Sequence, residues 1–176
     1  MSATPVRLVA LVVLLGVAPA TERLAAAQAN AVTTVILVRH AERESGTGDD
    51  PLSAHGRERA QALARVLRDT GVTTVITSGL TRTRETAEPF ARQANLTPEV
   101  IPPDQVDGVV ERVRSLAGGT VLIVHHSNTV PVIAEKFGAK IPPIADQEFD
   151  RLTVLTIPLS GSPSVVTLRY GASPGR

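Results

Sequence analysis

The stretch VILVRHAE, residues 35–42, constrains the fold of this chain more than any other segment. Four apolar residues, three of them β-branched, run directly into Arg39 and His40. A short apolar run of this kind is typical of a buried strand in an α/β sheet, because helices cover both faces of such a sheet. Ligands of open α/β sheets bind at the carboxyl ends of the strands. The charged pair therefore indicates an anion-binding site at the end of a buried strand.

Apolar runs of strand length alternate with helical patterns along the rest of the chain. The expected strands are residues 33–38, 73–77, 99–101, 120–124, 151–157 and 164–170, and the expected helices are 53–70, 80–93, 105–117 and 129–137. Ser53 is the expected N-cap of the first helix, and Gly71 is expected to end it. The alternation predicts the α/β class, as a three-layer α/β/α sandwich of about six mostly parallel strands. The connection at residues 158–163 is too short for a parallel crossover, so one of the last two strands should run antiparallel.

The N-terminal segment has the pattern of a secretory signal peptide. Arg7 precedes an apolar run at residues 8–17, and Ala27-Gln28-Ala29 fits an A-x-A cleavage site. An uncleaved N-terminal anchor is the alternative, but the apolar run is shorter than the roughly 20 residues that span a bilayer. We therefore expect residues 1–29 to be removed and residues 30–176 to form one secreted or periplasmic domain without stable membrane insertion.

Composition excludes several classes of function. The chain has no cysteine, which removes disulfides, cysteine nucleophiles and thiolate metal sites. Aromatic residues make up only 2% of the chain, too few for a platform that stacks bases, and the net charge is only +1. We therefore expect no nucleic-acid partner.

Polar residues suited to chemistry follow three of the expected strands. These segments are Arg39-His40, SGLTR at residues 78–82, and HHSN at residues 125–128. Because the carboxyl ends of parallel strands lie at the same edge of a sheet, the three segments should meet.

This combination of side chains suits a phosphoryl group. Guanidinium groups match phosphate oxygens, and a helix N-terminus adds backbone N–H donors. A neutral imidazole can attack phosphorus, and a second, protonated imidazole can stabilise the developing charge. Zinc is the alternative ligand for His40, His125 and His126, but no acidic ligand stands at a recognisable spacing and the arginines repel a cation. We expect neither a metal nor another cofactor.

Four segments in this order resemble the histidine phosphatase (phosphoglycerate mutase-like) superfamily. They are RHAE at residues 39–42, LSAHGRERA at 52–60, SGLTRTRETA at 78–87 and VHHSNT at 124–129. The resemblance implies an α/β/α sandwich of six strands, one of them antiparallel, and catalysis through a covalent phosphohistidine.

The resemblance also implies roles for individual residues. His40 takes the position of the phosphorylated nucleophile, and Arg39 and Arg82 take those of the two phosphate-binding arginines. His126 takes the position of the second histidine, which also binds phosphate. His125 stands where the family usually has glycine, so either histidine of the pair could face phosphate. The strand register and the Ser-Asn pair that follows favour His126.

The expected proton donor is an acidic residue past the third strand. Asp104 is the first acid there and Asp107 the next. The alternative is that both cap the following helix. A good leaving group needs no strong acid, so the reaction could also proceed without either carboxylate.

The sequence thus predicts an exported phosphomonoesterase that acts on a small-molecule phosphate ester. The alternatives are phosphoglycerate mutase-type phosphoryl transfer, a protein-phosphohistidine phosphatase, and a catalytically inactive binding module on the same fold. The sequence predicts neither the substrate nor the oligomeric state. The other charged side chains of these segments are expected on solvated surfaces, although Arg43 could approach the substrate. They are Glu42, Arg43, Glu44, His55, Arg57, Arg59, Arg84 and Glu85.

Overall fold

The computed structural model describes residues 32–45 and 48–173. The predicted signal peptide at residues 1–29 lies outside this part of the chain. Within the described part, each helix is too short or too polar to cross a membrane.

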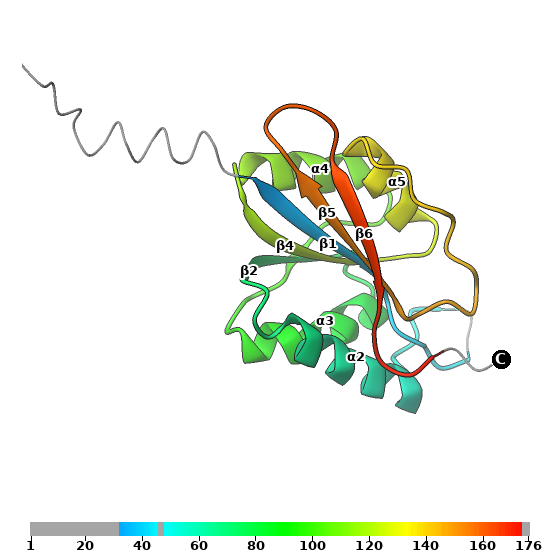
Figure 1. The fold of residues 1–176 in the computed structure, drawn as a ribbon. Helices are drawn as coiled ribbons and strands as arrows, with labels where there is room; N and C mark the ends of the chain where they lie inside the picture. The colour runs from blue at the N-terminus through cyan, green and yellow to red at the C-terminus, as the bar shows by residue number, and fades with distance from the viewer. Residues whose placement is uncertain (1–31, 46–47, 174–176) are drawn as a thin grey trace, which may run out of the picture.

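Six strands form one sheet, in the order β3-β2-β4-β1-β5-β6. The strands are β1 (Thr33–Arg39), β2 (Val72–Thr77), β3 (Glu99–Val100), β4 (Gly119–His125), β5 (Arg151–Ile157) and β6 (Ser164–Arg169). The helices are α2 (Ala54–Leu67), α3 (Thr81–Gln93), α4 (Val106–Ser115) and α5 (Thr129–Lys136). Helices α2 and α3 cover one face of the sheet, and α4 and α5 cover the other (Figure 1). This arrangement confirms the predicted three-layer α/β/α sandwich.

One strand of the sheet runs against the others. β4 is parallel to both β1 and β2, and β2 is parallel to β3. β5 is antiparallel to β1 on one side and to β6 on the other. The short β5–β6 connection therefore forms a hairpin, as its length required.

The central strand β1 contributes to two hydrophobic cores, one on each face of the sheet. Val35 and Leu37 pack in the core beneath α4 and α5, whereas Ile36 and Val38 pack in the core above α2 and α3. All four side chains are at most 3% exposed. Alternate residues of a strand point to opposite faces, so burial on both faces explains why this run is continuously apolar.

The ends of the first helix only partly match the prediction. Ser53 is the N-cap of α2, and its hydroxyl oxygen accepts a hydrogen bond from the Gly56 amide at 3.1 Å. The helix ends at Leu67, earlier than predicted, and a turn at residues 68–70 precedes Gly71. Arg68 is the C-cap of α2, so Gly71, with a positive φ of 68°, lies in the connection to β2 and does not cap the helix.

Candidate active site

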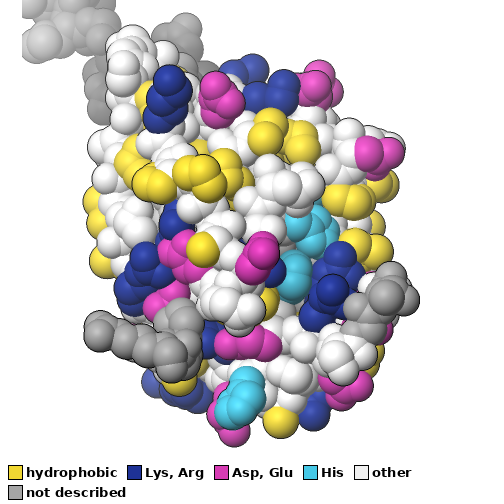
Figure 2. All heavy atoms as spheres, turned by 90° about the vertical axis from the view of Figure 1, so that its right-hand side faces the viewer, with side chains coloured by type: hydrophobic (Ala, Val, Ile, Leu, Met, Phe, Trp, Pro, Cys, Tyr) yellow, Lys and Arg dark blue, Asp and Glu magenta, His cyan; other side chains and the backbone are white. Residues whose placement is uncertain are grey.

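The carboxyl ends of β1, β2 and β4 open into a cleft of about 560 Å³. All five predicted site residues line it: Arg39, His40, Arg82, Asp104 and His126. Figure 2 shows histidine side chains in a hollow of this edge, with basic side chains beside them. The structure therefore brings together residues that lie about 40 positions apart in the sequence, as parallel strands at one sheet edge predict.

His40 is held in one tautomer by its own loop. Its Nδ1 lies 2.8 Å from the carbonyl oxygen of Ala41. A carbonyl only accepts hydrogen bonds, so Nδ1 carries the proton and Nε2 keeps the lone pair in the neutral ring. Burial, reinforced by the charges of nearby arginines, lowers the pKa of His40 from 6.5 to about 4. His40 is therefore a neutral imidazole with a free Nε2 near pH 7.

Two neighbouring helices hold the loop that follows His40. The Ala41 amide donates to the Thr86 hydroxyl of α3 at 2.9 Å. On the other side, the Ser53 amide donates to the Glu42 carbonyl at 2.9 Å. A Cβ atom on Gly56 would lie only 2.0 Å from the same carbonyl oxygen, so α2 approaches the loop backbone as closely as glycine permits.

A chain of hydrogen bonds orients His126. Its Nε2 lies 2.8 Å from the Ser78 hydroxyl, which lies 3.0 Å from the Thr83 hydroxyl. Thr83 donates its only hydroxyl proton to the Leu80 carbonyl at 2.7 Å. Ser78 must therefore donate to Thr83 and accept from His126, so Nε2 of His126 carries a proton. Nδ1 is then the atom of His126 that gains or loses a proton.

The environment of His126 disfavours its charged form when no anion is bound. Burial lowers its pKa to about 3, and repulsion from Arg82 and Arg39, and from His40 and His125 when they are protonated, adds to this effect. The His40 and His126 rings meet edge to face with centroids 5.3 Å apart. A phosphate group beside His126 would raise this pKa, because an opposite charge favours the protonated ring.

Arg39 is fixed by the loop that precedes β5. Its Nη1 donates to the carbonyls of Ala145, Asp146 and Glu148 at 3.0, 2.8 and 3.3 Å. Its guanidinium carbon lies 4.0 Å from the centroid of the Phe149 ring. This anchoring uses one nitrogen of the guanidinium group, and the buried Nε has no hydrogen-bond partner among the described residues.

Arg82 reaches the cleft from α3, and like Arg39 it has a buried Nε without a hydrogen-bond partner among the residues that the structure describes. Its Nη1 lies 3.9 Å from Asp49, and its side chain is 16% exposed. Its Nε is also buried without a hydrogen-bond partner in the described part of the chain. Buried donors are nearly always paired in folded proteins. Both guanidinium groups line one cleft, and their charge and planar arrays of N–H donors suit an anion there.

The two candidate proton donors lie in different places. Asp104 is exposed, lines the cleft and has no hydrogen bond or ion pair with another described residue. Gln105 is the N-cap of α4, without a side-chain hydrogen bond, so the helix-capping alternative is wrong for Asp104. Asp107 lies in the first turn of α4 and pairs with Lys136 at 2.6 Å, and it does not line the cleft.

His125 points away from the cleft. It is fully buried, and its Nδ1 lies 2.6 Å from the hydroxyl oxygen of Thr129. Burial lowers its pKa to about 4. Of the two adjacent histidines, His126 lines the cleft and His125 does not. The register predicted from the strand is therefore the one observed.

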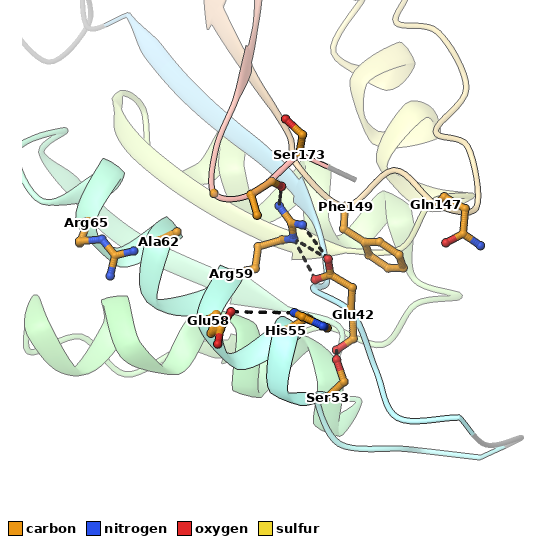
Figure 3. A pocket seen from close by; sticks show the side chains of 12 residues that line it. Glu42, Ser53, His55, Glu58, Arg59, Ala62, Arg65, Gln147, Phe149 and Ser173 are labelled. Carbon is orange, nitrogen blue, oxygen red and sulfur yellow. Dashed lines mark hydrogen bonds and ion pairs between the residues drawn. The ribbon is translucent and has the colours of Figure 1, made fainter. Parts of the chain in front are cut away.

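The prediction that Glu42, Arg59 and Glu85 lie on solvated surfaces is wrong. Arg59 is 5% exposed and binds both carboxylate oxygens of Glu42, with its closest contact at 2.6 Å (Figure 3). The same guanidinium donates to the Tyr170 carbonyl at 3.0 Å. Glu85 accepts a hydrogen bond from the Leu52 amide at 2.7 Å. These contacts join segments distant in sequence, so helical periodicity alone gave no signal for them.

The supporting hydroxyl groups were also missed at the sequence level. Ser78, Thr83, Thr86 and Thr129 are all buried and bond to a histidine, to one another or to the loop after His40. All four lie inside the segments that carry the resemblance, which was the one signal available. Among residues 32–45 and 48–173, no group of three or more histidine, aspartate and glutamate side chains is placed to hold a metal ion.

Comparisons with known proteins agree with this geometry. The sequence model of the histidine phosphatase superfamily (branch 1) matches residues 35–103. A probable phosphoglycerate mutase, GpmB of Klebsiella pneumoniae, is 45% identical over 64 residues, which cover 32% of this chain and only 30% of the relative. These matches confirm the resemblance to the histidine phosphatase superfamily, whose members are phosphatases or mutases.

Solved structures extend the similarity to the whole sandwich. The protein histidine phosphatase SixA, solved with tungstate, has a TM-score of 0.65 at 20% identity and covers 77% of this chain and 96% of its own. Phosphoglycerate mutase from Bacillus anthracis has a TM-score of 0.64 at 17% identity, over 81% of this chain and 95% of its own. At these identities the likeness shows the fold, which is that of the phosphoglycerate mutase-like histidine phosphatases.

Proposed function

We propose that this protein is a phosphomonoesterase that forms a covalent phosphohistidine on His40 and requires no metal or cofactor. One observation carries the proposal: a buried, neutral imidazole whose Nε2 keeps its lone pair shares a cleft with the guanidinium groups of Arg39 and Arg82. A phosphoryl group fits this combination, because its oxygens accept hydrogen bonds from guanidinium groups and its phosphorus accepts a nucleophile.

The first step transfers the phosphoryl group to the protein. Arg39 and Arg82 hold the phosphoryl oxygens while Nε2 of His40 attacks phosphorus and the bond to the leaving oxygen breaks. Asp104, in its protonated form, gives its proton to that oxygen. His126 takes up a proton on Nδ1 as the phosphate dianion binds, and it donates a hydrogen bond to an equatorial oxygen.

The second step releases phosphate. Water attacks the phosphorus of phosphohistidine, the N–P bond breaks, and the Asp104 carboxylate accepts the proton of the water. His40 returns to its neutral form because the Ala41 carbonyl still holds the proton on Nδ1.

Phosphoryl transfer back to an organic acceptor is the second candidate, supported by the 45% identity to a probable phosphoglycerate mutase. A protein-phosphohistidine substrate is the third, supported by the likeness to SixA in fold. We also propose that the protein is exported, on the evidence of the basic, apolar and small-residue segments at residues 1–29. N-terminal sequencing of the protein from a periplasmic or secreted fraction tests this.

The decisive experiment measures phosphate release from p-nitrophenyl phosphate by the purified protein. Activity should survive excess chelator, fall on addition of vanadate, and vanish in His40→Asn. The matched control is His55→Asn, because His55 lies on α2 with 87% of its side chain exposed. Rapid quenching should trap phosphate on the peptide that contains His40. An active His40→Asn variant, or zinc-dependent recovery after chelation, contradicts the proposal, and isomer formation without phosphate release favours the mutase.

A further inference from the structure

Arg43 is a third guanidinium group in the cleft, and neither step of the proposed reaction uses it. Its side chain is 40% exposed and pairs with Asp50 at 2.5 Å. It lines the same cleft as Arg39 and Arg82, although it belongs to the segment between β1 and α2 and not to a strand end.

The backbone of Arg43 is held in place. Arg43 forms an isolated antiparallel bridge with Leu52, and the Glu44 amide donates to the Pro51 carbonyl at 3.0 Å. Leu52 is fully buried, and its amide is bound by Glu85 at 2.7 Å. These contacts fix the backbone of Arg43 beside the cleft, although Arg43 belongs to neither a helix nor a long strand.

The cleft is lined by three arginines, one more than the proposed reaction needs to bind a phosphoryl group. Burial is the main cause of the lowered pKa values of His40 and Arg82, and the positive charge of Arg43 lowers both pKa values further. The three side chains are therefore close enough to interact electrostatically. Asp104 is the only carboxylate among the residues that line the cleft. Asp49 and Asp50, beside the cleft, offset part of the repulsion among these arginines, and an anion bound in the cleft would offset more of it.

The remaining lining suits a polar leaving group. Ser127 and Asn128 are polar and at least partly exposed, and among the described residues of the lining only Leu80 and Pro103 are apolar. An apolar aryl or lipid moiety would find little surface to bury here, because its affinity depends on the apolar area removed from water.

We propose that Arg43 binds a second anionic group, a carboxylate or a phosphate, carried by the leaving group of the substrate. This inference rests on the proposed phosphatase function and narrows its substrate to small phosphate esters with a further negative charge. Arg39 and Arg82 hold the scissile phosphoryl group, and Arg43 exchanges its contact with Asp50 for the second anion.

The test compares three esters: phenyl phosphate, 4-carboxyphenyl phosphate and 1,4-phenylene bisphosphate. Values of kcat/KM are measured for the wild type, for Arg43→Gln and for the control Arg65→Gln. Arg65 is exposed on α2 outside the cleft, so its loss changes the net charge equally. The wild type and the control should prefer a charged ester by about tenfold, the range of one charge-assisted hydrogen bond. Arg43→Gln should lose most of that preference and keep phenyl phosphate turnover within about threefold.

Each outcome decides the matter. Preference for one charged ester over the other identifies the second group as carboxylate or phosphate. Equal preference in the wild type and Arg43→Gln overturns the role of Arg43, and so does an equal loss for all three esters, which would place Arg43 on the scissile phosphoryl group. Hydrolysis of none of the esters by the wild type overturns the phosphatase function itself, and the inference falls with it.

Discussion

The Nε2 atom of His126 lies 2.8 Å from the Ser78 hydroxyl, and this contact determines which nitrogen of the ring can titrate. Ser78→Ala removes the acceptor for the Nε2 proton. Thr83→Val has a different effect, because the Ser78 proton then loses its acceptor and becomes free to point at His126. Each variant should lower kcat about tenfold, the cost of one lost hydrogen bond.

The control for this pair is Ser115→Ala, an exposed serine at the end of α4. Nitrogen NMR of labelled histidine should show Nε2–H in the wild type and a mixture of tautomers in Thr83→Val. Unchanged kcat in both variants would show that the chain from His126 to Thr83 does not orient the ring.

The low pKa of His40 predicts how activity responds to acid. Burial and the neighbouring arginines hold this pKa at about 4, so the ring stays neutral and nucleophilic at any pH well above 4. Below that pH the Nε2 lone pair is protonated and attack stops. Following the His40 ring proton by NMR from pH 3 to 8, with His40→Asn for assignment, should give a midpoint near 4. A midpoint at 6.5, the ordinary value, would contradict the burial of this ring in solution.

Three buried histidines also make the stability of the fold depend on pH. His40, His125 and His126 have pKa values of about 4, 4 and 3 in the folded state, against 6.5 when exposed. Between these values the unfolded chain binds more protons than the folded chain. The free energy of unfolding should therefore fall as pH drops from 6.5 towards 4, by up to about 1.4 kcal/mol per pH unit for each histidine.

His125 does not line the cleft, so a substitution there tests the pH dependence of stability without changing the proposed catalytic groups. His125→Asn keeps a nitrogen near the Thr129 hydroxyl but cannot titrate. Urea unfolding at pH 7 and pH 4.5 should show a smaller difference in this variant than in the wild type. His55→Asn, on the exposed surface, should leave the difference unchanged.

Most of the fold could be predicted because its signals are local. The continuous apolar runs of β1 and β4 indicated strands covered on both faces, and both strands lie in the centre of the sheet. The convergence of His40, Arg82 and His126 followed from parallel topology alone. The earlier end of α2 was not predictable from Gly71, because a turn of three residues separates the helix from that glycine.

The supporting contacts were harder to predict because their physical cause is not local. The sequence placed Arg59 on the exposed face of a helix, and its partner Glu42 lies 17 residues earlier. Burial of a guanidinium is tolerable only when a partner is present, and the partner becomes visible only once the chain has folded. The same holds for Glu85 and the Leu52 amide, 33 residues apart.

Replacing two helical glycines by alanine should change the stability of the protein in opposite directions. Alanine is the better helix former by about 1 kcal/mol. Gly108→Ala in α4 should gain part of this, because the new Cβ would meet its nearest atom, on Ile101, at an ordinary 3.6 Å. Gly56→Ala should destabilise the protein, because the new Cβ would lie 2.0 Å from the Glu42 carbonyl oxygen. Thermal unfolding of both variants shows whether each substitution raises or lowers stability. A stabilised Gly56→Ala would contradict the close approach of α2 to the loop after His40.

The Glu42–Arg59 pair should couple the stability of the fold to the position of the loop after His40. Burial opposes ionisation of Glu42, but the hydrogen bonds and charge of Arg59 outweigh it and hold the pKa of Glu42 below its ordinary value. Glu42→Ala leaves Arg59 buried without its carboxylate and should cost about 3–5 kcal/mol of unfolding free energy. Because Glu42 follows His40 by two residues, kcat should also fall at temperatures where the variant remains folded.

A double-mutant cycle separates the pair from the simple loss of side chains. Arg59→Met removes the charge and keeps apolar bulk, so Glu42→Ala combined with Arg59→Met should be more stable than Glu42→Ala alone. The contribution of Glu42 should also weaken in acid, since a carboxylate with a lowered pKa stabilises the fold above its unfolded pKa and loses that effect as pH falls through its folded pKa. If the two substitutions were additive in urea unfolding, the bidentate contact would carry no coupling energy, and the loop after His40 would be held by its contacts with Ser53, Gly56 and Thr86.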